Sequence, residues 1–201
     1  MRPLIALFSN NWDYFIKNEY SNQPDLISRS SKYVAHKWAQ ILEPISTAEI
    51  ALFQESLLDT QDNYPGTYRR FIHVGSSLED RIRNLFELCF EKGYTKVLFV
   101  ETFAAHLSTK SMTNALRALD ENDLVFTPTE TGTVCMMGMN LEIFPIWSSY
   151  DFNTKDCIVE MLTECLEKNI SYSIRSVLDQ STTESFFRSE IEKFNEKSVT
   201  D

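Results

Sequence analysis

The sequence predicts an α/β fold, a three-layer α/β/α sandwich with a mainly parallel, Rossmann-like sheet. Two patterns indicate it: short apolar runs typical of buried strands, and longer segments with apolar residues at helical spacing. Because strands and helices alternate along the chain, neighbouring strands are expected to pair in parallel through right-handed crossovers. The length of 201 residues suits one large domain, and we expect that domain to span residues 1–201.

The N-terminal elements are a strand, an irregular segment and a helix. Residues 4–8 form a continuous apolar run bounded by polar residues, which predicts a buried strand. Residues 12–28 have a mixed, aromatic-rich composition and are predicted to be irregular. Apolar positions at helical spacing predict a helix over residues 30–42, which ends at Glu43-Pro44.

The middle of the chain contains the clearest helix and strand. Residues 46–59 fit either a strand or a helix, and a short strand is expected over 70–74. A helix is predicted to begin after Ser77 as its N-cap and to end before Gly93, in the position that often follows a helix. Residues 96–100, Lys-Val-Leu-Phe-Val, are then predicted to form a buried strand.

The C-terminal half continues the alternation. Ser108 or Thr109 is expected to cap a helix that runs to Asp120. Further strands are predicted at 124–126, 134–139 and 170–174, and further helices at 154–167 and 183–194.

Composition limits the classes of partner. The formal net charge of −10 opposes binding to nucleic acid or to an anionic membrane surface, but a small nucleotide remains compatible with it. No stretch approaches the ~20 apolar residues of a membrane span, and the expected location is cytoplasmic. The cysteines are expected to be free core thiols. They are Cys89, Cys135, Cys157 and Cys165.

Two segments match motifs of a known family in the middle of the chain. Residues 76–82, Ser-Ser-Leu-Glu-Asp-Arg-Ile, share Leu78 and Arg81 with a helix start of the form Gly-Asp-Leu-Gly-x-Arg-Met. The strand that ends at Val100 continues into Glu101-Thr102, where the family's strand ends in Gly-Ser-Asp-Cys-Pro.

Two further segments match later motifs of the same family. Residues 131–138 share Gly132 and Gly138 with Asp-Gly-Gly-Tyr-Tyr-Leu-Ile-Gly. Residues 143–149 correspond to Leu-Phe-x-x-Ile-x-Trp-Ser-Thr, and the shared residues are Phe144, Trp147 and Ser148.

By these motifs the chain resembles a bacterial family of GT-A-like proteins assigned as glycosyltransferases, the selenodomain-associated transferases. The resemblance is best over residues 75–187. It implies a GT-A-type sheet, a nucleotide-diphosphate donor such as a nucleotide sugar, and Mg²⁺ or Mn²⁺. The chain departs from the family at two places. Its first strand is followed by Ser9–Phe15, which has neither glycine nor a basic cluster to hold phosphates, and Thr102 replaces the acidic metal ligand.

Three residues are candidate metal ligands. Glu101 follows the most buried predicted strand, at the sheet edge where ligands of parallel sheets bind, and is either a ligand contact or a solvated loop carboxylate. His106 could join it, or it is a loop residue satisfied by water. Asp179 falls where the family has an Asp-x-Asp-Thr segment, and the alternative is a residue that ends a loop.

Further residues are candidates for nucleotide or sugar binding, and each has a structural alternative. Trp147 could form a stacking wall for a sugar or base, but we prefer core packing. Glu130 either faces the cleft or belongs to a turn. Asn10 and Asn11 could read a nucleobase through their amides, or could cap an irregular turn. The complete set is Asn10, Asn11, Arg81, Thr102, Glu130, Gly132, Trp147 and Ser148.

The sequence leaves the function open between two main alternatives. One is a divergent, metal-dependent glycosyl- or nucleotidyltransferase. The other is a catalytically degenerate GT-A-like module for binding or scaffolding, which the missing phosphate loop and metal aspartate favour. A homodimer formed through apolar surface is a third expectation. No sequence context supports a Ser-His-Asp or Cys-His nucleophile, so no catalytic residue is assigned.

Overall fold

The structure is a computed structural model, and it describes most of the chain. The described residues are 2–9, 22, 24–55, 63–102, 104, 107–129, 134–147, 157–175, 189 and 192. Of the helix predicted over 183–194, Ser189 and Glu192 are described, and both are helical.

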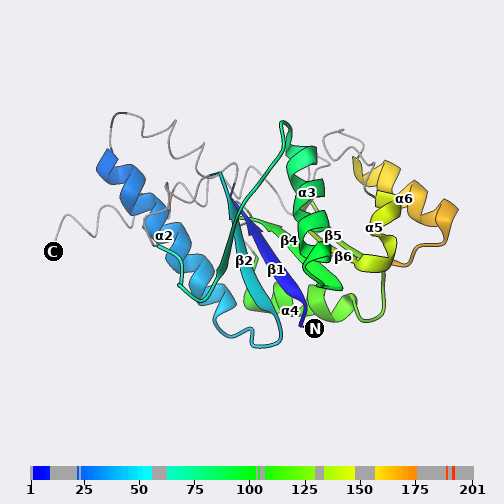
Figure 1. Cartoon of the computed structure of the whole chain (residues 1–201). Helices are drawn as coiled ribbons and strands as arrows, with labels where there is room; N and C mark the ends of the chain where they lie inside the picture. Colours follow the sequence, from blue (N-terminus) through cyan, green and yellow to red (C-terminus); the bar gives the residue numbers. More distant parts are fainter. Residues whose placement is uncertain are drawn as a thin grey trace.

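Strands and helices alternate over the first two thirds of the chain, except that the strands 49–54 and 69–72 follow each other with no helix among the described residues between them (Figure 1). The strands are β1 Leu4–Phe8, β2 Glu49–Gln54, β3 Arg69–Ile72, β4 Lys96–Glu101, β5 Leu124–Pro128, β6 Val134–Asn140 and β7 Tyr172–Ile174. The helices are α2 Pro24–Leu42, α3 Leu78–Glu91, α4 Thr109–Ala118, η1 Leu141–Ile143, α5 Phe144–Trp147 and α6 Cys157–Lys168.

The strands form one sheet in the order β3-β2-β1-β4-β6-β5-β7. Strands β3, β2, β1 and β4 are parallel to one another, and β5 is parallel to β7. Strand β6 is antiparallel to both of its neighbours. The sheet is therefore mainly parallel, as predicted, but the expectation of parallel pairing is wrong for β6. Only residues 129–133 separate β5 from β6, and so short a connection between adjacent strands requires them to run in opposite directions.

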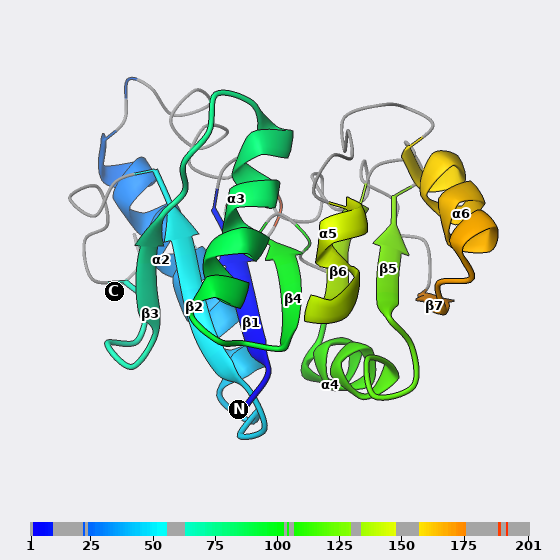
Figure 2. The same ribbon diagram turned by 45° about the vertical axis from the view of Figure 1, so that its right-hand side comes forward.

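Two apolar layers enclose the sheet, one on each face. In β1, Ile5 and Leu7 face the layer formed with α2 and α4, whereas Leu4, Ala6 and Phe8 face the layer formed with α3, α5 and α6. All five side chains are fully buried, because a central parallel strand is covered on both faces. Figure 2 shows α3 in front of the sheet and α2 behind it, which confirms the three-layer α/β/α sandwich.

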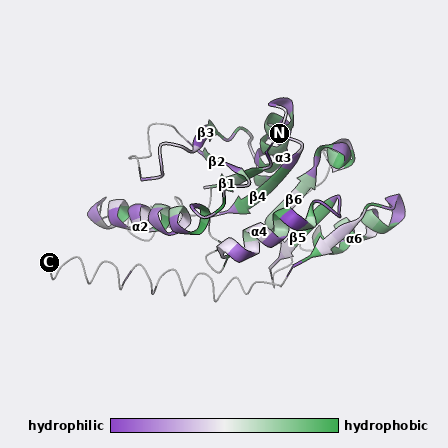
Figure 3. Cartoon of the chain, turned by 90° about the horizontal axis from the view of Figure 1, so that it is seen from below, coloured by the Kyte–Doolittle hydropathy of each residue, from purple (hydrophilic) through white to green (hydrophobic). Residues whose placement is uncertain are grey.

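Hydropathy follows these layers. Figure 3 shows strands in the hydrophobic colour between helices that carry hydrophilic stretches. Among the described residues, no helix combines the length and the apolar character needed to span a membrane.

The predicted boundaries hold in the middle of the chain. Ser77 caps α3 by accepting a hydrogen bond from the backbone N–H of Asp80, and Gly93 follows the helix with φ +88°. Ser108 is the residue that caps α4, through a reciprocal pair of hydrogen bonds with Ser111. Each cap supplies partners for backbone groups that the helix ends leave unsatisfied.

The largest boundary error lies in α2. The helix begins at Pro24, so residues 24–28, which were predicted to be irregular, are helical. Proline suits the first helical position because its missing N–H has no helical partner there, and Asp25 places a negative charge in the first turn. In the segment that fitted either element, residues 49–54 form the strand β2.

The predicted state of the cysteines is confirmed where their side chains are described. Cys89, Cys135 and Cys165 are free and buried, and burial raises the pKa of each thiol, to about 12 for Cys89 and Cys135. The side chain of Cys157 lies outside the described part of the chain. The three described thiols are therefore core residues rather than reactive nucleophiles.

Candidate functional site

The carboxyl ends of β1, β2, β3 and β4 meet along one edge of the sheet. Backbone hydrogen bonds extend the sheet one residue beyond these strands. Ser9 N–H donates to the Phe53 carbonyl at 2.9 Å, and Thr102 N–H donates to the Phe8 carbonyl at 3.1 Å. The chain passes from β1 to β2 on one side, whereas β4 flanks β1 on the other. This reversal lies between β1 and β4 and is the position where open parallel sheets bind ligands.

The loop between β3 and α3 approaches this edge and is attached to the start of α3. Asn84 donates its side-chain amide to the Val74 carbonyl at 2.8 Å. Arg81 Nε donates to the Gly75 carbonyl at 3.1 Å, and Ser76 Oγ donates to Asp80 Oδ2 at 2.9 Å. Three side chains of one helix therefore fix the loop, and they fix the position of the helix N-terminus relative to the sheet.

Arg81 places a positive charge at this edge. Its side chain is 25% exposed, and its Nη1 lies 3.5 Å from Oε1 of Glu55, the residue after β2. The backbone of Gly75 and the carboxylate of Glu55 thus orient the guanidinium from two sides. A planar guanidinium held in this way suits a phosphate or a carboxylate, which it can bind through two parallel hydrogen bonds.

Glu101 and Thr102 lie beside β1 but differ in environment. Glu101 is half-buried and pairs in register with Phe8. Burial, and then the nearby Glu101 charge, raises the pKa of Cys135 to about 12, so the Glu101 carboxylate lies near the Cys135 thiol in β6. Among the described members of the predicted metal set, Glu101 supplies a carboxylate at the expected edge.

Thr102 is 1% exposed and belongs to the interior of the sheet edge. Its hydroxyl donates to the Phe8 carbonyl at 3.2 Å, and its own carbonyl accepts from Trp38 Nε1 at 2.9 Å. The hydroxyl is thus engaged between β1 and β4. Thr102 therefore joins the ends of two strands, which is a structural role at the position where the resemblance leads one to expect an acidic ligand.

His73 and Glu55 belong to the same edge, although sequence reasoning did not select them. His73 is buried at the end of β3, with its ring centroid 5.0 Å from that of Phe8. Burial, and secondly the Arg81 charge, lower the pKa of His73 below its ordinary 6.5, while Glu55 acts in the opposite direction. The sequence signal was weak: Glu55 comes two residues after the apolar run that ends at Phe53, and His73 follows an apolar run of only two residues.

The lowered pKa of His73 predicts a pH dependence of stability. The unfolded chain takes up a proton near pH 6.5, whereas folded His73 resists protonation, so acid favours the unfolded state. The stabilisation that neutral His73 gives the folded state is therefore present above pH 6.5 and is lost as the pH falls. We expect His73→Gln to show a shallower loss of unfolding free energy between pH 7 and pH 5 than the wild-type protein, as measured by urea denaturation. Equal slopes for the two proteins would contradict the assignment.

Trp147 lies in the core rather than on a ligand wall. It is 1% exposed, and its ring centroid lies 6.3 Å from that of Phe126 at an interplanar angle of 57°. The preferred alternative of core packing is therefore the one that the structure supports. The remaining candidates lie outside the described residues. They are Asn10, Asn11, His106, Glu130, Gly132, Ser148 and Asp179.

The described residues do not by themselves form a complete metal site. Within that part of the chain, no group of three or more His, Cys, Asp or Glu side chains could hold an ion. Glu101 nevertheless fits one common pattern, in which Mg²⁺ is bound by one or two carboxylates and by substrate phosphates.

Comparison with solved structures identifies the fold. The chain is similar to a protein from Desulfovibrio desulfuricans G20 provisionally named a nucleotide-diphospho-sugar transferase, with 12% identity, a TM-score of 0.70, and coverage of 88% of this chain and 80% of that one. It is similar to 4-diphosphocytidyl-2C-methyl-D-erythritol synthase from Anaerococcus prevotii DSM 20548, with 10% identity, a TM-score of 0.58 and 87% coverage of each chain. A manganese complex from Mycobacterium tuberculosis H37Rv shares 7% identity and a TM-score of 0.54, over 96% of this chain and 98% of that one.

These likenesses confirm the GT-A-like fold that the motifs predict, and at such low identities they show the fold alone. None of the curated proteins is similar to this chain at a significant level. The sequence model of one family matches residues 45–154, which is more than half of the chain. The chain therefore belongs to the family described as "Uncharacterized protein conserved in bacteria (DUF2064)".

Proposed function

We propose that this chain binds the phosphates of a nucleotide at the carboxyl edge of β1–β4 and acts as a divergent glycosyl- or nucleotidyltransferase. The observation that carries the proposal is the position of Arg81, in the first turn of α3 at the sheet edge where GT-A-like folds have their strand reversal. The structural neighbours named as nucleotide-diphospho-sugar and diphosphocytidyl enzymes support the same ligand class.

Arg81 is the residue that we assign to the phosphates. Its contact with Glu55 is 3.5 Å long, at the limit of a hydrogen bond, so a phosphate oxygen at 2.7–2.9 Å would be a stronger partner. The Gly75 carbonyl accepts from Nε, and the Glu55 carboxylate accepts from Nη1. The start of α3 adds a favourable environment for negative charge, because backbone N–H groups point out of a helix N-terminus.

Glu101 is the residue that we assign to Mg²⁺ or Mn²⁺. Such an ion, when bound, neutralises the charge that develops on a diphosphate leaving group. Glu101 supplies the carboxylate, and its half-buried position beside β6 limits its freedom to turn away. Asp179 and His106 remain proposed co-ligands, and Asn10, Asn11, Glu130, Gly132 and Ser148 remain proposed contacts for the base or sugar.

A second candidate function is a module that binds nucleotide without turnover. Thr102 favours it, because the residue at the family's acidic position is buried and its hydroxyl is engaged with the Phe8 carbonyl. Both candidate functions use Arg81 to bind the phosphates, and they differ in whether the bound nucleotide reacts. A measurement of released pyrophosphate or nucleoside diphosphate distinguishes them, because only a transferase releases either product.

Nucleotide binding is tested by thermal melting with CTP and with a UDP-sugar, each with and without Mn²⁺. A ligand at ~100 times its dissociation constant adds about 2.7 kcal/mol to the unfolding free energy. Arg81→Met is expected to weaken binding roughly 10- to 100-fold, the factor that the loss of a charge-assisted hydrogen bond produces.

The matched control is Arg117→Met, which removes the same charge from the last turn of α4. It should leave the ligand-induced shift unchanged. If neither nucleotide shifts the melting temperature, or if both variants lose the shift equally, the proposed site is wrong. A shift that requires Mn²⁺ and is lost in Glu101→Gln supports the metal assignment.

A further inference from the structure

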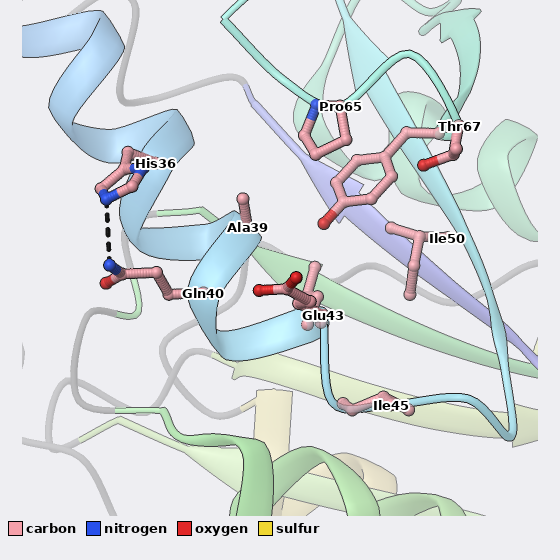
Figure 4. Close-up of a pocket in the computed structure, with 10 residues that line it drawn as sticks. His36, Ala39, Gln40, Glu43, Ile45, Ile50, Pro65 and Thr67 are labelled. Atoms are coloured by element: carbon pink, nitrogen blue, oxygen red, sulfur yellow. Dashed lines mark hydrogen bonds between the residues drawn. The ribbon is translucent and has the colours of Figure 1, made fainter.

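A pocket of about 460 Å³ lies away from the candidate nucleotide site. It is bordered by the C-terminal half of α2, by Ile50 near the start of β2, and by Tyr68 just before β3 (Figure 4). These are the amino ends of β2 and β3, whereas the nucleotide site lies at their carboxyl ends. The two sites therefore occupy opposite edges of the sheet.

The pocket has a size suited to a small molecule. Its volume lies within the 300–1,000 Å³ of typical ligand pockets, and its lining residues are apolar and polar in equal number. The apolar walls are Ala39, Leu42, Ile45, Ile50 and Pro65. The polar groups are His36, Gln40, Glu43, Thr67 and Tyr68, with Gln40 Nε2 2.9 Å from His36 Nε2.

The charge at the pocket is negative. Glu43 is exposed, and no salt bridge to its carboxylate is found among the described residues. Burial, and secondly the Glu43 charge, raise the pKa of Tyr68 to about 12, so Glu43 acts on the pocket wall and Tyr68 stays a neutral donor. Figure 4 shows Glu43 at the end of α2, between Ala39 and Ile45.

The end of α2 adds to this negative potential. A helix C-terminus carries partial negative charge, and many helices offset it with a basic residue, but α2 has none in its last turn. Pro44 has no N–H, so the Gln40 carbonyl lacks the donor that another residue type would supply four positions later. Glu43 and the helix end therefore act in the same direction.

We propose that this pocket binds a small organic cation, an amine or guanidine carried on an apolar body. The cation pairs with Glu43 at the end of α2, and the apolar body packs against Leu42, Ile45 and Ile50. An anionic ligand is opposed by the same groups. The proposal is independent of nucleotide binding, because none of the pocket residues belongs to the nucleotide site.

The test uses phenethylamine and its neutral counterpart 2-phenylethanol, titrated by calorimetry into the full chain. We expect the amine to bind roughly tenfold more tightly than the alcohol, because a charged partner strengthens a hydrogen bond. Glu43→Gln should remove this preference and leave the affinity for the alcohol unchanged. Glu87→Gln removes an exposed carboxylate from α3 and is the matched control that should retain it.

A second variant tests whether the probes bind in this pocket, because it fills the space without changing any charge. Ala39 lies on the α2 wall of the pocket and is only partly buried, so Ala39→Phe should fill the space and weaken both probes at least tenfold. Equal affinities for amine and alcohol, or an amine preference that survives Glu43→Gln, would overturn the proposal. Unchanged affinity of Ala39→Phe for both probes would also overturn the proposal.

Discussion

Replacing Trp38 with alanine is expected to lower the free energy of unfolding by about 3–5 kcal/mol, the usual cost of truncating a buried aromatic residue. The side chain is 1% exposed and lies in the layer between α2 and the sheet. Its Nε1–H also donates to the Thr102 carbonyl at 2.9 Å, between residues 64 positions apart in the chain. The mutation therefore removes core volume and a tie between α2 and the end of β4. Urea denaturation, at constant m-value, is the measurement.

Trp38→Phe separates these two contributions. It keeps an aromatic ring in the layer but removes the donor, so the buried Thr102 carbonyl loses its Trp38 partner, at a cost of about 1–3 kcal/mol. The difference between the two variants then reports lost volume. A cost below 1 kcal/mol for Trp38→Ala would mean that α2 does not pack on the sheet as described.

The sequence predicts the central part of the fold well because the signals there are local. The run Val97–Val100 is apolar over a strand's length, and Ser77 and Gly93 are residue types that favour the two ends of a helix, here α3. The start of α2 was missed because residues 12–28 lack an apolar period, and Pro24 at a first helical position is a weak signal taken alone.

Strand direction and the candidate site depend on information that local patterns do not contain. The antiparallel pairing of β6 with β4 depends on which strands become neighbours in the sheet, and the apolar pattern of β6 is the same for either strand direction. Likewise, Glu55 and Arg81 are 26 positions apart, and they meet only because β2 and β3 pair in parallel and α3 folds back over their ends. The position of Glu101 at the sheet edge could be predicted, because Glu101 directly follows the apolar residues of a buried strand.

Gly75→Ala is expected to cost roughly 2–3 kcal/mol of unfolding free energy, from backbone strain and a steric clash together. Gly75 has φ +143°, a conformation that residues with a Cβ rarely adopt. A Cβ built at this position would lie 2.7 Å from Asp80 Cβ and 2.8 Å from Arg81 N. The atoms it meets include the backbone of α3, which cannot move aside as a flexible side chain can. The control is Gly66→Ala, since a Cβ there meets nothing within 4 Å.

The same substitution links the fold to the proposed function. The Gly75 carbonyl accepts from Arg81 Nε, so a shift of the loop away from α3 displaces the acceptor that orients the guanidinium. We therefore expect Gly75→Ala to weaken nucleotide binding at temperatures where the variant is still folded, by a factor comparable to that of Arg81→Met, while Gly66→Ala binds as the wild-type protein does. Normal nucleotide affinity in a destabilised but folded Gly75→Ala would show that the β3–α3 loop serves stability alone. In that case the Gly75 carbonyl is not needed to orient Arg81 for nucleotide binding.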